Sequence, residues 1–204
     1  TGASSLRKGG RSVFHVRASY TAEVHRLMQR LVEMNLKSIG VVYLDNPYGR
    51  EMLEDAIHEL DKNGITLTVQ AAVATDSSNL PEVLTKVTAA RPAAVLLATA
   101  GSASEGLVRG LKKKLPGLLM TGISSTLMGD APKQLGEAVS GMALSLIVPN
   151  PFNTKTGVVR DYQAEMRSVG QPDFSPGRLD SYINTRLLAE GVERAVPAVK
   201  QDKQ

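Results

Sequence analysis

The amino-acid sequence predicts an α/β fold with a doubly wound, mostly parallel sheet and helices on both faces. Short apolar runs rich in β-branched residues alternate along the chain with longer segments of helical spacing. The apolar runs are continuous, as expected of parallel strands that are buried on both faces. Strands that alternate with helices are joined by right-handed crossovers, and a doubly wound sheet is then the default arrangement.

The first predicted elements follow a loop at residues 1–10, which are small, polar and rich in glycine. Residues 12–18 alternate between the two faces of a strand, and residues 38–44 form a continuous β-branched run. Between these strands, residues 21–35 carry an apolar stripe at helical spacing, with Thr21 as the expected N-cap.

The alternation then repeats four times. Each predicted helix is followed by a strand, in the pairs 48–63 and 66–73, 80–90 and 93–98, 102–114 and 118–121, and 131–135 and 142–148. Gly64 closes the first of these helices at a C-cap position. Pro81 lies in the first turn of the second helix, where its missing N–H has no intrahelical partner to lose, and Ser78 or Asn79 caps that helix.

The alternation stops after Val148. Residues 149–151 (Pro-Asn-Pro) predict a turn or linker, and helices over 154–169 and 179–195 follow with no strand between them. The last helix carries an apolar stripe that needs a partner surface, formed by Tyr182, Ile183, Leu187, Leu188 and Val192.

Composition excludes several classes of site. The 204 residues are 42% apolar and 22% charged, which is ordinary for a soluble globular protein. The chain has no cysteine, so thiolate metal sites, thiol catalysis and disulfides are absent. The net charge of +4 comes from scattered basic residues, and we therefore expect no nucleic-acid partner. No apolar run approaches the roughly 20 residues that span a bilayer.

No pattern typical of catalysis or of a cofactor is present. The histidines at positions 15, 25 and 58 lie on different predicted elements, and the metalloprotease, nucleophile-elbow, Walker and dinucleotide-binding motifs do not occur. Asp45 follows a strand like the phosphoacceptor of a receiver domain, but the other acids and the lysine of such a magnesium site are missing. We therefore predict no catalytic residue, no metal site and no cofactor.

Three turns follow strands that are neighbours in a flavodoxin-like order, 2-1-3-4-5, and ligands of such sheets bind beyond these strand ends. The candidate binding residues are Tyr48 in the first turn, Ala100, Gly101 and Ser102 in the second, and Ser124 in the third. A phenol, hydroxyls and the free amides of a helix start suit a small carboxylate-bearing ligand. In the alternative interpretation, Tyr48 only packs on the following helix and the small residues only form turns.

Five segments, in their order and spacing, resemble one family. They are VRASY, IGVVYLDNPYGRE, PAAVLLAT, GEAVSGMALSLIVPNP and DSYINTRLLAEGVERA. Together they resemble the branched-chain amino-acid type of ABC-importer substrate-binding proteins, which have the type I periplasmic-binding fold. The resemblance runs over residues 1–195.

This resemblance implies two α/β lobes that clamp a ligand, and a chain that holds mainly the second lobe. Residues 1–18 would cross between the lobes, and residues 19–148 would form the ligand-binding lobe. Residues 149–204 would contain the return crossing and helices that belong to the first lobe. The chain begins at Thr1 rather than at Met, as an excised piece would. We expect the surface left by the missing lobe to be covered by local refolding or by self-association.

The resemblance also implies roles for the predicted site residues. Tyr48 matches a tyrosine that reaches the ligand, and the turn at residues 100–102 matches one that faces the cleft. The best-known members carry an aromatic residue in that turn, and near the position of Ser124 a glutamate that pairs with the ammonium group of the ligand. Both are absent here, so an aromatic or organic acid is as reasonable a ligand as an amino acid.

The protein implied is not an enzyme. It is the solute-binding component of an ABC importer, periplasmic or extracellular and membrane-associated, which closes about a hinge on a small-molecule ligand and presents it to an ABC permease. The alternative is the ligand-sensing domain of a receptor or transcriptional regulator with the same fold. A hydrolase or dehydrogenase would need a catalytic base near Tyr48, where Asp45 is the only candidate.

Overall fold

The computed structural model describes residues 2–4, 7, 10 and 13–201, with side chains described up to residue 195. The chain divides into two compact units, Thr1–Ser145 and Leu146–Gln204. The first unit contains the sheet with its covering helices, and the second contains two helices, α6 and α7.

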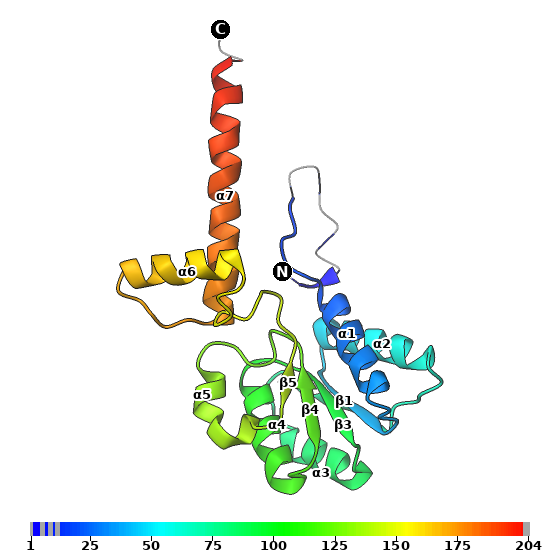
Figure 1. Cartoon of the computed structure of the whole chain (residues 1–204). Coiled ribbons are helices and arrows are strands. Elements are labelled where there is room, and N and C mark those ends of the chain that lie inside the picture. Colours follow the sequence, from blue (N-terminus) through cyan, green and yellow to red (C-terminus); the bar gives the residue numbers. More distant parts are fainter. Residues whose placement is uncertain (1, 5–6, 8–9, 11–12, 202–204) are drawn as a thin grey trace. The chain divides into compact units, whose positions relative to one another are not determined.

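The first unit is built on a five-stranded parallel sheet (Figure 1). Its strands are β1 (Ile39–Leu44), β2 (Val69–Val73), β3 (Ala94–Ala98), β4 (Leu119–Gly122) and β5 (Ala143–Leu144). Their order across the sheet is β2-β1-β3-β4-β5, and every neighbouring pair is parallel. The predicted α/β class and the predicted strand order are both confirmed.

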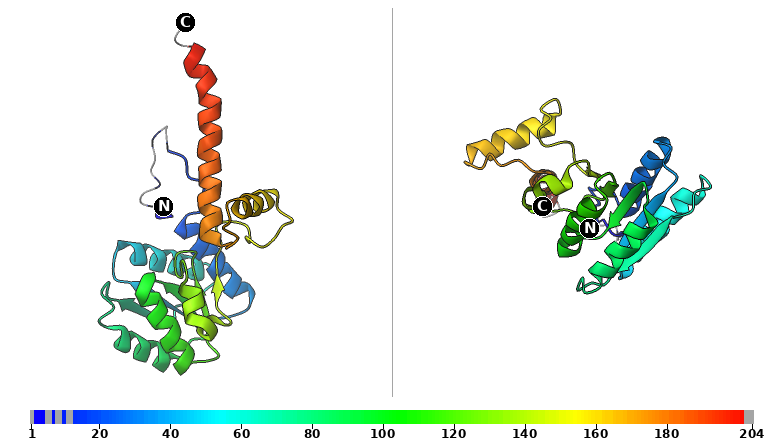
Figure 2. Two further views of the ribbon diagram at one scale, coloured as in Figure 1. Left: turned by 90° about the vertical axis from the view of Figure 1, so that its left-hand side faces the viewer. Right: turned by 90° about the horizontal axis from the view of Figure 1, so that it is seen from below.

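Helices cover both faces of this sheet (Figure 2). On one face lie α1 (Tyr20–Glu33) and α2 (Pro47–Asp61), and on the other lie α3 (Leu80–Ala90) and α4 (Gly101–Lys114). The side chains of successive strand residues point to opposite faces of the sheet. Within β3, Leu96 packs with α1 and α2, whereas Leu97 packs with α3 and α4. Both faces are therefore dry, which accounts for the continuous apolar runs in the sequence.

Two shorter helical segments follow β4. They are α5 (Ala131–Leu135) and a 3-10 helix over Gly136–Val139. Leu135 is buried in the apolar core on the side of α3 and α4, so this connection closes that face of the sheet before the chain enters β5.

Side-chain caps fix where the helices begin. The Oγ of Ser19 accepts the amide hydrogen of Ala22 at 3.1 Å, so Ser19 caps α1 and the expected cap at Thr21 is wrong by two residues. Asn46 caps α2 by accepting from the amide of Gly49 at 2.9 Å. Asn79 occupies the N-cap position of α3, but its side chain instead bonds the end of β2 and the residue after it.

Three predicted strands differ from the structure, and the one expected over 66–73 begins only at Val69. Residues 13–18 form no strand, and Ser12 lies outside the described residues. An alternating segment becomes a strand only when another strand accepts its backbone hydrogen bonds, and none of the described residues pairs with this one. The strand expected over 142–148 is limited to Ala143–Leu144, because its partner β4 ends at Gly122.

The second unit consists of α6 (Gly157–Ser168) and α7 (Pro176–Gln201) around a small core of Val159, Tyr162 and Leu179. Further along α7, three large apolar side chains are exposed, namely Leu187, Leu188 and Val192. Within the part of the chain that the structure describes, no helix is long and apolar enough to cross a bilayer.

Candidate functional site

The turns that follow β1 and β4 meet at the carboxyl edge of the sheet. The hydroxyl groups of Tyr48 and Ser125 are hydrogen-bonded at 2.9 Å. Thr126 donates its hydroxyl to the carbonyl oxygen of Leu97 at 3.0 Å, which ties the second turn to β3. Since β3 lies between β1 and β4, these bonds connect both sides of the edge that open α/β sheets use for ligands.

Tyr48 lies in the first turn of α2 and is half-buried. Its ring packs edge-on against that of Tyr20, with 5.3 Å between the ring centroids, and beside the apolar core formed by α1 and α2. The ring packs against the helices, as in the packing interpretation, and the hydroxyl reaches the neighbouring turn; contact of Tyr48 with a ligand stays a prediction.

Burial raises the pKa of Tyr48 to about 12, although the hydrogen bond to Ser125 acts in the opposite direction. The phenol is therefore neutral at physiological pH and acts as a hydrogen-bonding group, not as a base.

An alkaline titration checks this state of Tyr48. Because an unfolded tyrosine ionises near pH 10, we expect the neutral phenol to stabilise the fold fully below about pH 10, and this contribution to disappear as the pH rises to about 12. Phenolate absorbance should show a component with a midpoint near pH 12 that is missing in Tyr48→Phe. Loss of a component with a midpoint near pH 10 instead would contradict the burial of this hydroxyl.

Ser124 is bonded within the first unit instead of being free at the edge. Its amide and its hydroxyl both donate to the carboxylate of Glu23, at 2.8 and 3.0 Å. Glu23 lies in the first turn of α1 with 4% of its surface exposed. The same carboxylate accepts the hydroxyl of Ser145 at 2.5 Å, and the Nη2 of Arg17 lies 3.5 Å away. An ionised carboxylate has about four acceptor positions, and four donors surround this one.

Arg17 completes this group of side chains. Its Nη2 donates to the hydroxyl of Ser124 at 2.8 Å, and the guanidinium carbon lies 5.3 Å from the centre of the Tyr20 ring. Its Nε is buried without a hydrogen-bond partner among the described residues. Arg17, Glu23, Ser124 and Ser145 are called the edge network below.

The turn after β3 presents backbone at the same edge. Ala100 is the N-cap residue of α4 and makes no side-chain capping bond, and Gly101 has φ of +60°. Gly101 and Ser102 are exposed, whereas the next polar pair, Thr99 and Ser104, is buried and hydrogen-bonded at 2.8 Å. Residues 100–102 share this edge with Tyr48 and Ser124 because β3 lies between β1 and β4 in the sheet.

Sequence reasoning missed several residues at this edge, namely Arg17, Tyr20, Glu23 and Ser145, whereas Ser125 adjoins the predicted Ser124 in the same turn. One signal was available for Glu23, because it borders the apolar stripe of its helix, where a charged residue needs partners. The other residues become neighbours only when the strands pair.

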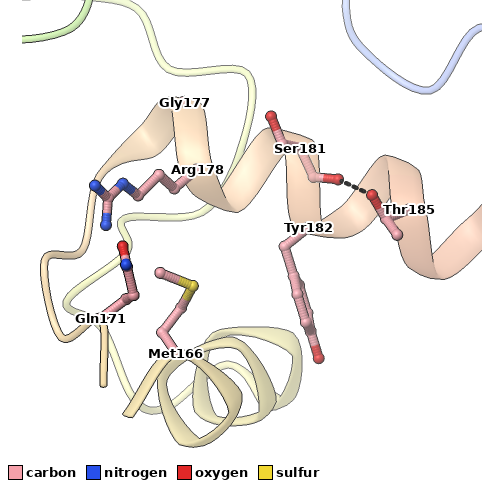
Figure 3. Close-up of a pocket in the computed structure, with 7 residues that line it drawn as sticks. All are labelled: Met166, Gln171, Gly177, Arg178, Ser181, Tyr182 and Thr185. Atoms are coloured by element: carbon pink, nitrogen blue, oxygen red, sulfur yellow. Dashed lines mark hydrogen bonds between the residues drawn. The ribbon is translucent and has the colours of Figure 1, made fainter. Parts of the chain in front are cut away.

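Two of the hollows in the described structure are lined by residues of other segments. One, of about 520 Å³, lies in the second unit between α7 and the end of α6 (Figure 3); it is lined by Met166, Gln171, Gly177, Arg178, Ser181, Tyr182 and Thr185. The other, of about 530 Å³, lies beside residues 65–70, which include the start of β2. Neither hollow includes a predicted site residue. Among the described residues, no group of three or more histidine, aspartate or glutamate side chains could hold a metal ion.

Comparison with known proteins identifies the family. A family model described as periplasmic binding protein matches residues 1–203. A comparison with curated proteins finds no match.

Three solved structures have the same fold. A substrate-binding periplasmic protein from Ralstonia solanacearum is 28% identical, with a TM-score of 0.85 over 96% of this chain and 56% of that one. A possible leucine/isoleucine/valine-binding protein from Rhodopirellula baltica is 23% identical, with a TM-score of 0.83 over 94% and 54%. An ABC transporter solute-binding protein from R. palustris in complex with benzoate is 12% identical, with a TM-score of 0.68 over 83% and 47%.

The chain thus spans about half the length of each of these proteins. The match to the family model covers nearly the whole chain, and the parallel sheet has the architecture of the type I periplasmic-binding fold. The chain therefore belongs to the periplasmic binding protein family, whose members are extracytoplasmic, non-enzymatic substrate-binding proteins.

Proposed function

We propose that this chain is the ligand-binding lobe of the solute-binding component of an ABC importer, and that it clamps a small carboxylate-bearing ligand against a second lobe. The ligand would be an amino acid or an aromatic or organic acid. One observation carries the proposal: Tyr48 and Ser125, from the turns after two neighbouring parallel strands, are joined at the edge where α/β sheets bind ligands. The benzoate-bound relative of the same fold supports an acid as the ligand.

The proposal divides the chain into three parts. Residues 1–18 form one crossing between lobes, residues 19–148 form the lobe, and residues 149–204 contain the return crossing and helices of the other lobe. The boundary after residue 18 rests on the family resemblance alone, whereas the change of contact unit between Ser145 and Leu146 supports the second of these boundaries. The exposed apolar side chains on α7 support it too, because a partner surface would cover them.

Binding would work by hinge closure. A ligand that contacts both lobes binds the closed form more tightly than the open form, and it shifts the population toward closure by that difference in affinity. The permease would recognise the closed form. No covalent step is required. The neutral phenol of Tyr48 would line the site and offer its hydroxyl as a hydrogen-bonding group.

Calorimetric titration of the full-length protein with L-leucine, L-phenylalanine, benzoate and 3-phenylpropanoate tests the proposal. For the ligand that binds, we expect Tyr48→Ala to weaken the affinity by about 10- to 100-fold, because contact area and a hydrogen bond are both lost. Tyr48→Phe removes the hydroxyl alone and should cost about 3- to 10-fold.

Tyr43→Phe is the matched control, because it removes a hydroxyl from another half-buried tyrosine of the first unit, located in β1. Its affinity should equal that of the unchanged protein. If both Tyr48 variants bind as tightly as this control, the site does not lie at this edge.

A further inference from the structure

The carboxylate of Glu23 ties together two parts of the chain that are distant in the sequence. Arg17 precedes α1, and its Nη2 lies 3.5 Å from one carboxylate oxygen. Ser145 follows β5 as the last residue of the first unit, and its hydroxyl donates to the other oxygen at 2.5 Å. One side chain in the first turn of α1 therefore holds the chain both where it enters this helix and where it leaves the first unit.

Outside these two residues the chain is loosely held. Residues 13–16 and 146–150 form neither helix nor strand. Ser145 still donates its amide to the carbonyl oxygen of Gly122 at 3.0 Å. Large apolar side chains are exposed in both segments, namely Val13, Phe14, Val16 and Leu146. A change from firmly bonded to loosely held chain thus occurs at Arg17 and again at Ser145.

Glu23 is itself fixed to the sheet. The amide and the hydroxyl of Ser124 donate to its carboxylate at 2.8 and 3.0 Å. Ser124 lies in the turn after β4, which the hydrogen bond from Thr126 to Leu97 ties to β3. The carboxylate is buried, and hydrogen bonds to a buried charge are stronger than those at the surface. The edge network therefore couples both parts of the chain to the sheet and not only to each other.

We infer that Glu23 is the hinge anchor of this lobe. It fixes Arg17 and Ser145, the points at which the two crossing segments join the lobe, so that the backbone rotations of closure occur outside them. Hinges are formed by a few residues that absorb large changes in φ and ψ, and residues 13–16 and 146–150 are placed to do so. This inference rests on the proposed function and adds the element that keeps its site rigid while the lobes move.

Glu23 is a positioning residue, because its buried carboxylate acts on the crossing segments and is shielded from a ligand. Without this anchor, rotation would extend into the turn after β4, which carries Ser125, the hydrogen-bond partner of Tyr48. We therefore expect loss of Glu23 to loosen both crossing segments at once and to make the closed form harder to reach.

Pairs of spin labels on the full-length protein measure this directly. These 204 residues contain no cysteine, and any cysteine in the rest of the protein would first be replaced by serine. Val16→Cys and Leu146→Cys place nitroxides one residue outside the anchored positions, and pulsed electron paramagnetic resonance gives the distribution of distances between them. A reference pair, Glu54→Cys on α2 and Lys113→Cys on α4, occupies exposed positions within the lobe.

In Glu23→Gln the distribution between positions 16 and 146 should become about 2-fold wider or more, while that of the reference pair stays unchanged. Glu33→Gln, which replaces an exposed carboxylate of the same helix, should change neither distribution. Equal widths in the two variants would overturn the inference. Broadening of the reference pair by the same factor would overturn it as well, because the whole lobe and not the hinge would then be loosened.

Ser145→Ala tests the anchor with a smaller loss of stability, and it decides the question should Glu23→Gln fail to fold. It removes one of the donors to Glu23 and should also broaden the distribution between positions 16 and 146. Ser140→Ala is its matched control, because it too removes a serine hydroxyl that donates to a glutamate, here the exposed Glu137 at 3.3 Å. An equal result for the two serine variants would contradict the anchor.

Ligand affinity separates this inference from the proposed function. L-leucine, L-phenylalanine, benzoate and 3-phenylpropanoate are titrated into the unlabelled proteins. For the probe that binds the unchanged protein, Glu23→Gln should weaken the affinity by about 3- to 10-fold, and Glu33→Gln should leave it unchanged. Equal affinities in these two variants would overturn the role of Glu23 in closure while leaving the proposed function intact. Absence of binding by all four probes to the unchanged protein would refute the proposed function itself, and this inference with it.

Discussion

Replacing Glu23 by glutamine is expected to lower the free energy of unfolding by about 3–5 kcal/mol, the usual cost of removing one partner from a buried ion pair. The carboxylate is 4% exposed and accepts from Ser124, Ser145 and Arg17. A glutamine has nearly the same shape but replaces one acceptor oxygen with an NH2 group. Two of the four donors would then face a donor, and the charge of Arg17 would lose its counterion.

Glu33→Gln is the matched control on the same helix. Glu33 is exposed and pairs with Arg26 and Arg30 at the surface, so its replacement should change stability by less than about 1 kcal/mol. Urea unfolding of the three proteins measures the difference. A cost for Glu23→Gln that is as small as for Glu33→Gln would mean that water, and not Glu23, satisfies the edge network.

A second large effect is expected at Gly49, the residue next to Tyr48. A Cβ atom at this position would overlap the carbonyl oxygen of Leu44 and lie 2.7 Å from its backbone nitrogen. Backbone atoms at the end of β1 cannot rotate away as a side chain could, so α2 would have to shift relative to the strand. We expect Gly49→Ala to lower the free energy of unfolding by about 3 kcal/mol or more.

Gly117→Ala provides the control for this substitution, because no atom lies within 4 Å of its Cβ position and its φ is not positive. It should change stability by less than about 0.5 kcal/mol. Gly49→Ala should also weaken ligand binding, since the shift of α2 moves Tyr48 away from Ser125. An unchanged midpoint of thermal unfolding in Gly49→Ala would show that α2 does not pack this closely on β1.

The sheet was predictable because its signals are local. Each buried strand is a continuous apolar run, and each helix carries its own stripe; the bounds of α3 (Leu80–Ala90) agree with the prediction at both ends. The segment at 13–18 has an equally clear alternation but forms no strand. Periodicity shows which side chains could lie on one face of a strand. A strand also needs a neighbouring strand for its backbone hydrogen bonds, and the sequence of the segment alone does not show whether that neighbour exists.

The candidate site was only partly predictable for a related reason. Tyr48 could be chosen because it follows a strand at the correct edge. The edge network could not, because Glu23 meets Ser124 and Ser145 across 101 and 122 residues of sequence. Whether a turn residue faces a ligand or a carboxylate of the protein depends on the helix that packs beside it. Ser124 was predicted to face the ligand, but it is hydrogen-bonded to the carboxylate of Glu23.

The strand order also bears on how the sheet is assembled during synthesis. β2 pairs with one side of β1. The later strands then add on the other side of β1, β3 first, then β4 and β5, which is also the order in which they are synthesised. No later strand has to insert between two that are already paired. Each addition needs only one crossover, so the polypeptide avoids breaking earlier contacts while it lengthens.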